Sequence, residues 1–192
     1  MSGNITDSLA NLIRSGSKFA CIYADPPWKY ENQATRSATK NHYPTMTAEE
    51  IAALPVAQTT SDDAIVHLWT TSSFLHNAFH ILEAWDFEYK SSFIWVKPQM
   101  GIGNYWRISH EFLLTATRGK VRFQDHGIMS WLRENRTQHS AKPETVRQLI
   151  EKASPGPRLE LFGRRRVSGW TVLGNQIEDD GLFTPSEFAG VE

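Results

Sequence analysis

The sequence has little cysteine and no excess of charge of either sign. Its single cysteine, Cys21, excludes an internal disulfide and a cysteine-rich zinc site, and it predicts a reducing, cytoplasmic location. The 20 Lys and Arg residues against 21 Asp and Glu give a net charge of −1. A protein that wraps nucleic acid by charge alone is strongly basic, so that class is excluded. Any contact with nucleic acid must therefore be local or shared with another chain.

Long apolar runs are also absent. No run approaches the ~20 apolar residues that cross a bilayer, and the N-terminus lacks the basic-then-apolar layout of a signal peptide. We therefore expect no membrane association. The apolar content of 40% is enough for a core, and 192 residues fit one domain with a tail. The predicted domain covers residues 1–177, and residues 178–192 are predicted to form a loose acidic tail.

Helical and strand patterns alternate along the chain. Strands are predicted at 19–23, 64–69, 87–96, 112–117, 159–162 and 170–173, and helices at about 7–16, 47–55, 72–84 and 143–153. Asp7 and either Ser72 or Ser73 are predicted to cap two of the helices, and Thr47 with Glu50 forms a capping box for a third. This alternation predicts an α/β fold with a mainly parallel sheet and helices on both faces.

The first predicted strand ends at Asp25-Pro26-Pro27-Trp28. Ligands of open α/β sheets bind beyond the carboxyl ends of the strands, so we expect a site here. The two prolines have no N–H donor and leave carbonyl acceptors, while Asp25 adds a carboxylate and Trp28 a flat aromatic face. Acceptors beside an aromatic ring suit a planar base with an exocyclic amine. The alternative is an ordinary turn with a buried tryptophan.

Further motifs follow in a fixed order along the chain. They are Tyr43-Pro44-Thr45-Met46, His139-Ser140-Ala141-Lys142-Pro143-Glu144, Ser154-Pro155-Gly156, Leu159-Glu160-Leu161-Phe162-Gly163-Arg164, Gly169-Trp170 and Leu173-Gly174-Asn175-Gln176. With the Asp-Pro-Pro-Trp motif, they resemble the DPPW-type N(6)-adenine methyltransferases. This family includes the catalytic subunit of the eukaryotic messenger-RNA adenosine methyltransferase and its bacterial and phage relatives. The resemblance runs from about Lys18 to Ile177.

The resemblance implies a Rossmann-like methyltransferase fold with permuted motif order, and S-adenosylmethionine as cosubstrate without a metal. By the same resemblance, Glu160 would accept from the ribose hydroxyls, and Arg164 or Arg118 would pair with the methionine carboxylate. Arg118 and Arg166 stand where the messenger-RNA enzyme has a lysine and a histidine. The implied cosubstrate-binding set is Asp25, Arg118, Glu160, Phe162, Arg164, Arg166, Asn175 and Gln176.

The implied catalytic set is Asp25, Pro26, Pro27 and Trp28. The lone pair of an adenine amine is delocalised into the ring, so the amine is a poor nucleophile. Hydrogen bonds from its two protons to Asp25 and the Pro26 carbonyl would direct the lone pair at the methyl group. Trp28 and Tyr43 would sandwich the base. Cys21 lies within a strand, so we expect no covalent intermediate.

The predicted function is methylation of adenine N(6) in nucleic acid, with DNA favoured over RNA and a homodimer possible. Loop cations would form a local phosphate-binding rim: Lys29, Arg36, Lys40, Arg107, Lys120, Arg122, Arg133 and Arg136. The aromatic and basic segment Asn104-Tyr105-Trp106-Arg107 would contact either nucleic acid or a second subunit. The alternatives are a non-catalytic scaffold that binds RNA or a partner, and an enzyme that methylates cytosine or RNA amines.

Overall fold

The computed structural model describes residues 5–30, 44–99, 101, 105–136 and 141–174. The helices are α1 (Ile5–Arg14), α2 (Ala48–Ala52), α3 (Leu75–Ala84) and α4 (Glu144–Ala153), with short 3₁₀ turns η1 (Val56–Thr59) and η2 (Ser72–Phe74). The strands are β1 (Phe19–Ala24), β2 (Thr60–Thr70), β3 (Glu88–Val96), β4 (His110–Arg118), β5 (Trp131–Arg133), β6 (Arg158–Leu161) and β7 (Trp170–Leu173).

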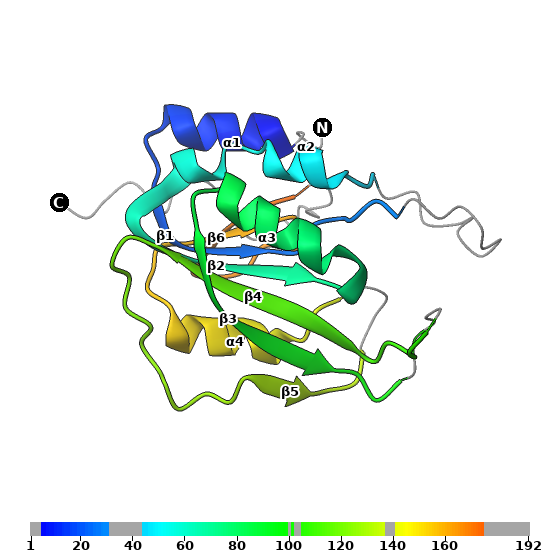
Figure 1. Ribbon diagram of the computed structural model, residues 1–192. Helices are drawn as coiled ribbons and strands as arrows, with labels where there is room; N and C mark the ends of the chain where they lie inside the picture. The colour runs from blue at the N-terminus through cyan, green and yellow to red at the C-terminus, as the bar shows by residue number, and fades with distance from the viewer. Residues whose placement is uncertain (1–4, 31–43, 100, 102–104, 137–140, 175–192) are drawn as a thin grey trace.

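The described strands form one sheet in the order β5-β3-β4-β2-β1-β6-β7 (Figure 1). Strand β1 lies between β2 and β6 and is parallel to both, and β6–β7 and β3–β5 are parallel pairs. Strand β4 is antiparallel to both of its neighbours, β2 and β3. The sheet is therefore mainly parallel, as predicted, and β4 runs against the other described strands.

Helices cover both faces of the sheet, as the burial within β1 requires. Ile22 and Ala24 pack in a core with residues of α1, α2 and α3, whereas Cys21 and Tyr23 pack in a second core with residues of α4 (Figure 1). Successive side chains of a strand point to opposite faces, so a strand buried on both faces is apolar throughout. All these side chains in β1 are at most 3% exposed.

Local signals in the sequence located most element boundaries. The capping box is present: the Thr47 side chain accepts from the Glu50 N–H, and the Glu50 carboxylate accepts from the Thr47 N–H. Two predicted caps are wrong. Asp7 lies within the first turn of α1, which already begins at Ile5. The segment Ser72–Phe74 forms a 3₁₀ turn before α3, which has no side-chain cap.

One strand was missed. Strand β5 has three residues, two of them exposed, and pairs only with β3 among the described strands. No strand was predicted for this segment, because it has neither the length nor the apolar alternation of a strand. Strand β2 is longer than predicted, since it begins at Thr60 and includes the polar residues Asp62 and Asp63.

A buried polar contact links the sheet to the end of α4. His67 Nδ1 lies 3.1 Å from Thr115 Oγ1, and His67 Nε2 lies 2.8 Å from Ser154 Oγ. Burial lowers the pKa of His67 to about 3, because the charged imidazolium is poorly solvated in this core. His67 is therefore neutral in the folded protein near pH 7.

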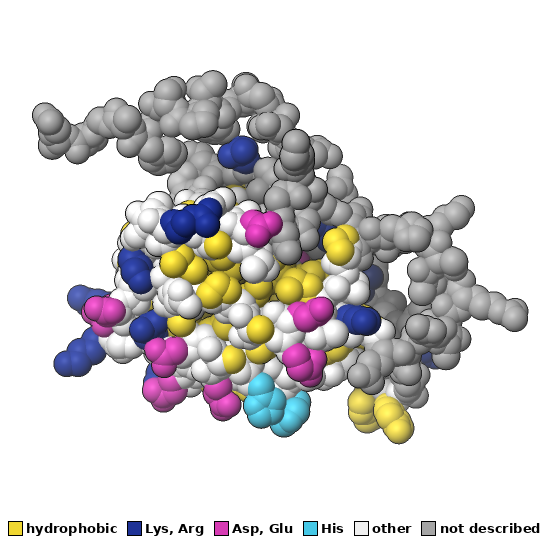
Figure 2. All heavy atoms as spheres, turned by 90° about the horizontal axis from the view of Figure 1, so that it is seen from above, with side chains coloured by type: hydrophobic (Ala, Val, Ile, Leu, Met, Phe, Trp, Pro, Cys, Tyr) yellow, Lys and Arg dark blue, Asp and Glu magenta, His cyan; other side chains and the backbone are white. Residues whose placement is uncertain are grey.

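The longest helices in the described part of the chain have ten residues, too few to span a bilayer. On the face seen in Figure 2, the described acidic and basic side chains are interspersed around apolar surface. This face therefore presents no basic field of its own. The predicted tail 178–192 and the candidate residues Tyr43, Asn175, Gln176, Arg36 and Lys40 lie outside the described residues.

Candidate active site

Asp25 follows the last residue of β1 at the carboxyl edge of the sheet. Strands β1 and β6 are parallel, and the Asp25 N–H donates to the Leu161 carbonyl at 3.5 Å, just beyond the last pair of the ladder. Asp25 thus stands where parallel strands end together, which is the usual ligand position in this architecture. Its side chain is 28% exposed, so it is accessible from this edge.

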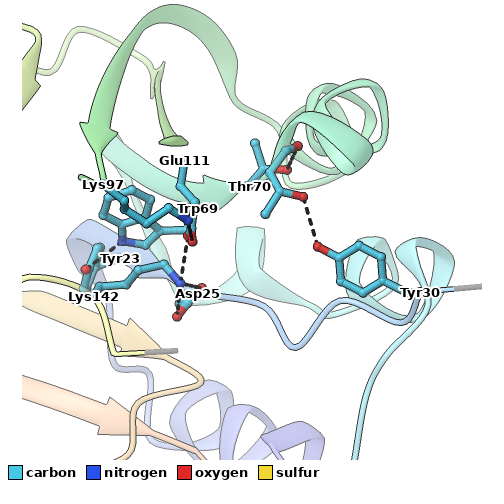
Figure 3. Close-up of polar contacts among 9 residues, drawn as sticks. Tyr23, Asp25, Tyr30, Trp69, Thr70, Lys97, Glu111 and Lys142 are labelled. Atoms are coloured by element: carbon cyan, nitrogen blue, oxygen red, sulfur yellow. Dashed lines mark hydrogen bonds and ion pairs between the residues drawn. The ribbon is translucent and has the colours of Figure 1, made fainter. Parts of the chain in front are cut away.

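Four charged side chains form an alternating chain at Asp25 (Figure 3). Lys142 Nζ lies 2.7 Å from each carboxylate oxygen of Asp25 and 3.3 Å from Glu111 Oε2. Lys97 Nζ lies 2.7 Å from Glu111 Oε1. Glu111 belongs to β4, whose amino end reaches this edge because β4 is antiparallel to its neighbours. This group of four side chains contains two positive charges, on Lys97 and Lys142, and two negative charges, on Asp25 and Glu111.

The charges shift one another's pKa values. Burial raises the pKa of Asp25, and the Lys142 ammonium group opposes part of that rise. Burial alone would also raise the pKa of Glu111, but the ammonium groups of Lys142 and Lys97 together lower it. The pKa of Lys142 is raised, because the attraction of the two carboxylates exceeds the effect of burial. Lys142 therefore remains charged and favours an ionised Asp25.

Aromatic rings form a row beneath these charges, on the face covered by α4. Lys97 lies over Trp95 at 5.3 Å and Lys142 over Trp69 at 5.5 Å from the ring centroids. Trp69 packs against Trp95 at 6.2 Å and donates its Nε1–H to the Tyr23 hydroxyl at 2.7 Å. The row therefore connects β3, β2 and β1 and supports the cations from below.

Trp28 is less open than its place in the sequence motif predicted. Its side chain is 8% exposed and stacks on Phe74 at 4.9 Å, with the rings 14° from parallel. Tyr30 meets the same Phe74 ring edge-on at 4.6 Å. The Tyr30 hydroxyl, which Figure 3 shows, lies 3.2 Å from Thr71 Oγ1. Tyr30 is 57% exposed. Tyr30 thus exposes an aromatic surface, whereas Trp28 contributes mainly to packing.

The proline carbonyls shape the turn after β1. The Trp28 N–H donates to the Pro26 carbonyl at 2.9 Å, and the Met46 N–H donates to the Pro27 carbonyl at 2.8 Å. Pro26 is buried and Pro27 is half-buried. A carbonyl oxygen has a second lone pair, so Pro26 can still accept a further hydrogen bond.

Glu160, the candidate ribose acceptor, lies on β6 next to Tyr23 of β1. Arg147 of α4 holds it through two hydrogen bonds, Nη2 to Oε1 at 2.9 Å and Nη1 to Oε2 at 2.5 Å. Burial raises the pKa of Glu160, and Arg147 opposes that rise. The sequence predicted the position of Glu160 but did not identify its partner.

The segment after β6 makes a tight turn toward β7. Phe162 has a left-handed backbone with φ of 66° and is half-buried against the core, and the Gly163 N–H donates to the Leu173 carbonyl at 3.0 Å. A Cβ on Gly174 would overlap the Gly163 carbonyl oxygen, so the close contact of these two segments requires glycine. Arg164 and Arg166 are exposed, and the charge of Arg164 lowers the pKa of Asp25.

The structure does not bring Arg118 to this edge. Arg118 pairs with Ala64 at the other end of β2, where its Nη1 donates to the Ala57 carbonyl at 3.1 Å and to Thr60 Oγ1 at 3.0 Å. It lines an open cavity of about 650 Å³ there, with Asp62, Glu83, Asp86, Phe87, Glu88, Thr117 and Gly119. Lys120 follows β4 at the same distant edge, so it does not join a rim around Asp25.

Three charged residues of the site were missed by sequence reasoning. Lys142 was part of a quoted motif without an assigned role, and Glu111 and Lys97 were not singled out. The sequence did contain a signal for Glu111, because an acidic residue at the start of an apolar strand needs a charged or hydrogen-bonding partner when it is buried. The partner could not be named, because it depends on the direction of β4.

The sheet order, the helices on both faces and the charged site at the carboxyl edge define an α/β Rossmann-like methyltransferase fold. Residues 19–176 match the model of the MT-A70 family. The chain therefore belongs to the MT-A70 family.

Individual relatives agree with this assignment. The chain is 33% identical to the type II methyltransferase M.MunI of Mycoplasma, over 88% of this chain and 82% of that protein. It is 31% identical to the N(6)-adenosine-methyltransferase catalytic subunit METTL3 of Homo sapiens, over 90% of this chain and 30% of that protein. It is also 31% identical to the N(6)-adenosine-methyltransferase MT-A70-like protein of Drosophila melanogaster, over 88% of this chain and 28% of that protein. The chain thus spans most of the Mycoplasma protein and less than a third of the two animal proteins.

Proposed function

We propose that the protein transfers a methyl group from S-adenosylmethionine to the N(6) amine of adenine in DNA. The observation that carries this proposal is the position of Asp25, an accessible carboxylate at the joint carboxyl edge of β1 and β6, held by the partly buried Lys142. Membership of the MT-A70 family and relatives named as N(6)-adenosine methyltransferases support the same reaction.

Asp25 would accept one proton of the adenine amine and the Pro26 carbonyl the other. Lys142 uses one lone pair on each Asp25 oxygen, and each oxygen has another, so the carboxylate can accept the amine while staying ionised. As the new N–C bond forms, the bond between the methyl group and the sulfonium sulfur would break and release S-adenosylhomocysteine. Positive charge would then pass to the amine, where the negative Asp25 would stabilise it. Asp25 then takes the amine proton or passes it to water.

The residues present fit the cosubstrate, which supplies an electrophilic methyl group on its sulfonium when bound. Glu160 offers carboxylate lone pairs to a ribose diol, and Lys142 and Arg164 place positive charge near Asp25 for a methionine carboxylate. Phe162, Arg166, Asn175 and Gln176 complete the proposed binding set. Arg118 is not included, because it contacts Ala57 and Thr60 at the other edge.

For an unstacked base, the proposal includes Tyr30 as a stacking surface in addition to the sequence-predicted Tyr43. Tyr30 is exposed, while its hydroxyl at Thr71 and its ring at Phe74 hold it in place. We propose DNA as the substrate because similarity to the Mycoplasma type II methyltransferase extends over most of both chains. Similarity to the animal adenosine methyltransferases covers less than a third of those proteins.

The direct test is methyl transfer from labelled S-adenosylmethionine to mixed DNA and RNA oligonucleotides, with digestion to identify the modified base. We expect label in N(6)-methyladenine of DNA. Asp25→Asn should lower the rate by about 100-fold or more, since it removes the charge that stabilises the transition state. Asp62→Asn is the matched control, because Asp62 lies at the opposite edge of the sheet.

Each other outcome has a defined meaning. Label in cytosine would keep the mechanism and change the base, and label in RNA alone would overturn the choice of DNA. Absence of transfer together with absence of cosubstrate binding by calorimetry would favour a non-catalytic scaffold. A homodimer and a cytoplasmic location stay predictions, which analytical ultracentrifugation and cell fractionation test.

A further inference from the structure

We propose that Arg147 is a positioning residue of the cosubstrate site, which fixes the Glu160 carboxylate in the orientation that receives the ribose hydroxyls. This inference rests on the proposed function, because it gives Arg147 a role in binding the adenosyl ribose. It explains why the guanidinium of a buried arginine on α4 is directed at Glu160 near the end of β6.

The first argument is the geometry of the pair. Arg147 and Glu160 are each only 8% exposed, and the guanidinium engages both carboxylate oxygens in a planar fork. A fork of this kind fixes the rotation of the carboxylate as well as its position. The lone pairs that remain on the two oxygens then point in defined directions, and a ribose diol needs two such acceptors.

The second argument is the support beneath Arg147. Its Cζ lies 5.4 Å from the Tyr23 ring centroid and 5.3 Å from the Trp170 ring centroid. The two rings meet edge-on at 5.9 Å, and Trp170 donates its Nε1–H to Glu151 of the same helix at 2.6 Å. These contacts hold the guanidinium in place, so Glu160 meets a fixed partner.

The third argument is continuity with the catalytic carboxylate. Tyr23 lies below Arg147 and also accepts from Trp69, the ring beneath Lys142. The same aromatic row thus supports the cation that holds Asp25 and the cation that holds Glu160. An arginine that served only to join α4 to the sheet would not require Glu160 as its partner at the ligand edge.

The test measures binding of S-adenosylhomocysteine and of its 2′-deoxy and 3′-deoxy analogues by calorimetry. Arg147→Met keeps an unbranched apolar side chain but removes the guanidinium group and with it the fork. We expect it to weaken S-adenosylhomocysteine binding by about 10- to 100-fold, the usual cost of losing a residue that orients a ligand-binding group. Arg14→Met is the matched control, because Arg14 is an exposed arginine at the end of α1, which packs on the face of the sheet opposite to α4.

The analogues separate positioning from general structural support. The wild-type protein should bind at least one deoxy analogue much more weakly than S-adenosylhomocysteine, and Arg147→Met should lose this discrimination. Arg147→Lys keeps the charge without the planar fork, so it should also discriminate less, and it serves if Arg147→Met does not fold by circular dichroism.

Two results would overturn this inference without overturning the proposed function. One is wild-type affinity in folded Arg147 variants, and the other is full discrimination between the analogues in those variants. If the wild-type protein fails to bind S-adenosylhomocysteine at all, the proposed function falls and the inference falls with it. The wild-type measurement therefore distinguishes the two failures.

Discussion

Lys142 Nζ is equidistant, at 2.7 Å, from the two carboxylate oxygens of Asp25. Lys142 lies just before the start of α4, and its ammonium group contacts the Asp25 carboxylate symmetrically. Glu111 of β4 pairs with the same ammonium group at 3.3 Å. In the proposed mechanism, Asp25 must be ionised to accept the substrate amine. Lys142 lowers the pKa of Asp25 against the effect of burial, so we expect it to influence the pH range of the proposed activity.

Replacing Lys142 should shift the pH dependence of methylation. Burial raises the pKa of Asp25 and Lys142 opposes this effect, so Lys142→Met should raise the pKa further. More Asp25 is then protonated at a given acidic pH, and the acid limb of the kcat profile should move to higher pH. Lys90→Met is the control, since Lys90 pairs with Glu88 on the exposed part of β3. An acid limb that stays in place in Lys142→Met would contradict this role.

His67 should make the protein less stable in mild acid. Its pKa is about 3 in the folded state and about 6.5 in the unfolded chain, so below pH 6.5 the unfolded state binds the extra proton. The contribution of neutral His67 to the free energy of unfolding is complete above pH 6.5, and it is lost progressively as the pH falls toward 3. Between pH 7 and pH 5 the free energy of unfolding should fall by about 2 kcal/mol from this group.

Urea unfolding at the two pH values measures this loss. His67→Gln should be less stable at pH 7 but should lack this part of the pH dependence. His80→Gln should keep it, because His80 is exposed on α3. Equal pH dependence in the wild-type and His67→Gln proteins would show that His67 is not the source.

Gly163→Ala should disturb both stability and cosubstrate binding. The added Cβ would overlap Val172 Cγ1 and lie 3.1 Å from Glu160 Cδ, so β7 or Glu160 must move. We expect a loss of about 1–3 kcal/mol in unfolding free energy and weaker S-adenosylhomocysteine binding.

Gly16→Ala provides the comparison. Gly16 has φ of 71°, and a Cβ added there would have no atom within 4 Å, so alanine costs only backbone strain of about 1 kcal/mol. Its cosubstrate affinity should equal that of the wild-type protein. Wild-type affinity in Gly163→Ala would show that Glu160 tolerates displacement.

Arg118→Met should affect stability but not cosubstrate affinity. It removes the hydrogen bonds to Ala57 and Thr60 at the amino end of β2, each worth about 1–3 kcal/mol when the donor is charged. Calorimetry with S-adenosylhomocysteine and urea unfolding measure the two effects. A large loss of affinity without loss of stability would restore Arg118 to the cosubstrate site.

The sequence located features that depend on neighbouring residues. The apolar run of β1, the capping box at Thr47 and the helix after Pro143 are local patterns, and the structure contains each of them. The strand-end position of Asp25 followed from the same reasoning. A three-residue strand such as β5 depends instead on its hydrogen bonds to β3, which no local pattern reports.

The contacts of the site depend on relations between distant segments. Lys142 and Asp25 are 117 positions apart, and their pairing follows from the packing of α4 against β1. The sequence motif at Asp25 predicted a free aromatic face on Trp28, but Phe74 of a later segment covers one side of it. Arg118 was selected through the resemblance to the methyltransferase family, and the strand direction places it at the other edge.

The pairing of β4 with its neighbours has a consequence for the four charged residues at Asp25. Side chains alternate between the faces of a strand, so a slip of β4 by one residue would turn Glu111 away from Lys97 and Lys142 toward the opposite core. Strand β3 contains an irregularity between Tyr89 and Ser91, and beyond it the pairing with β4 continues without interruption to Glu111 and His110. Correct strand registration is therefore a condition for assembling the charges around Asp25, and a register error far along the hairpin would separate these charges without altering any of the four residues.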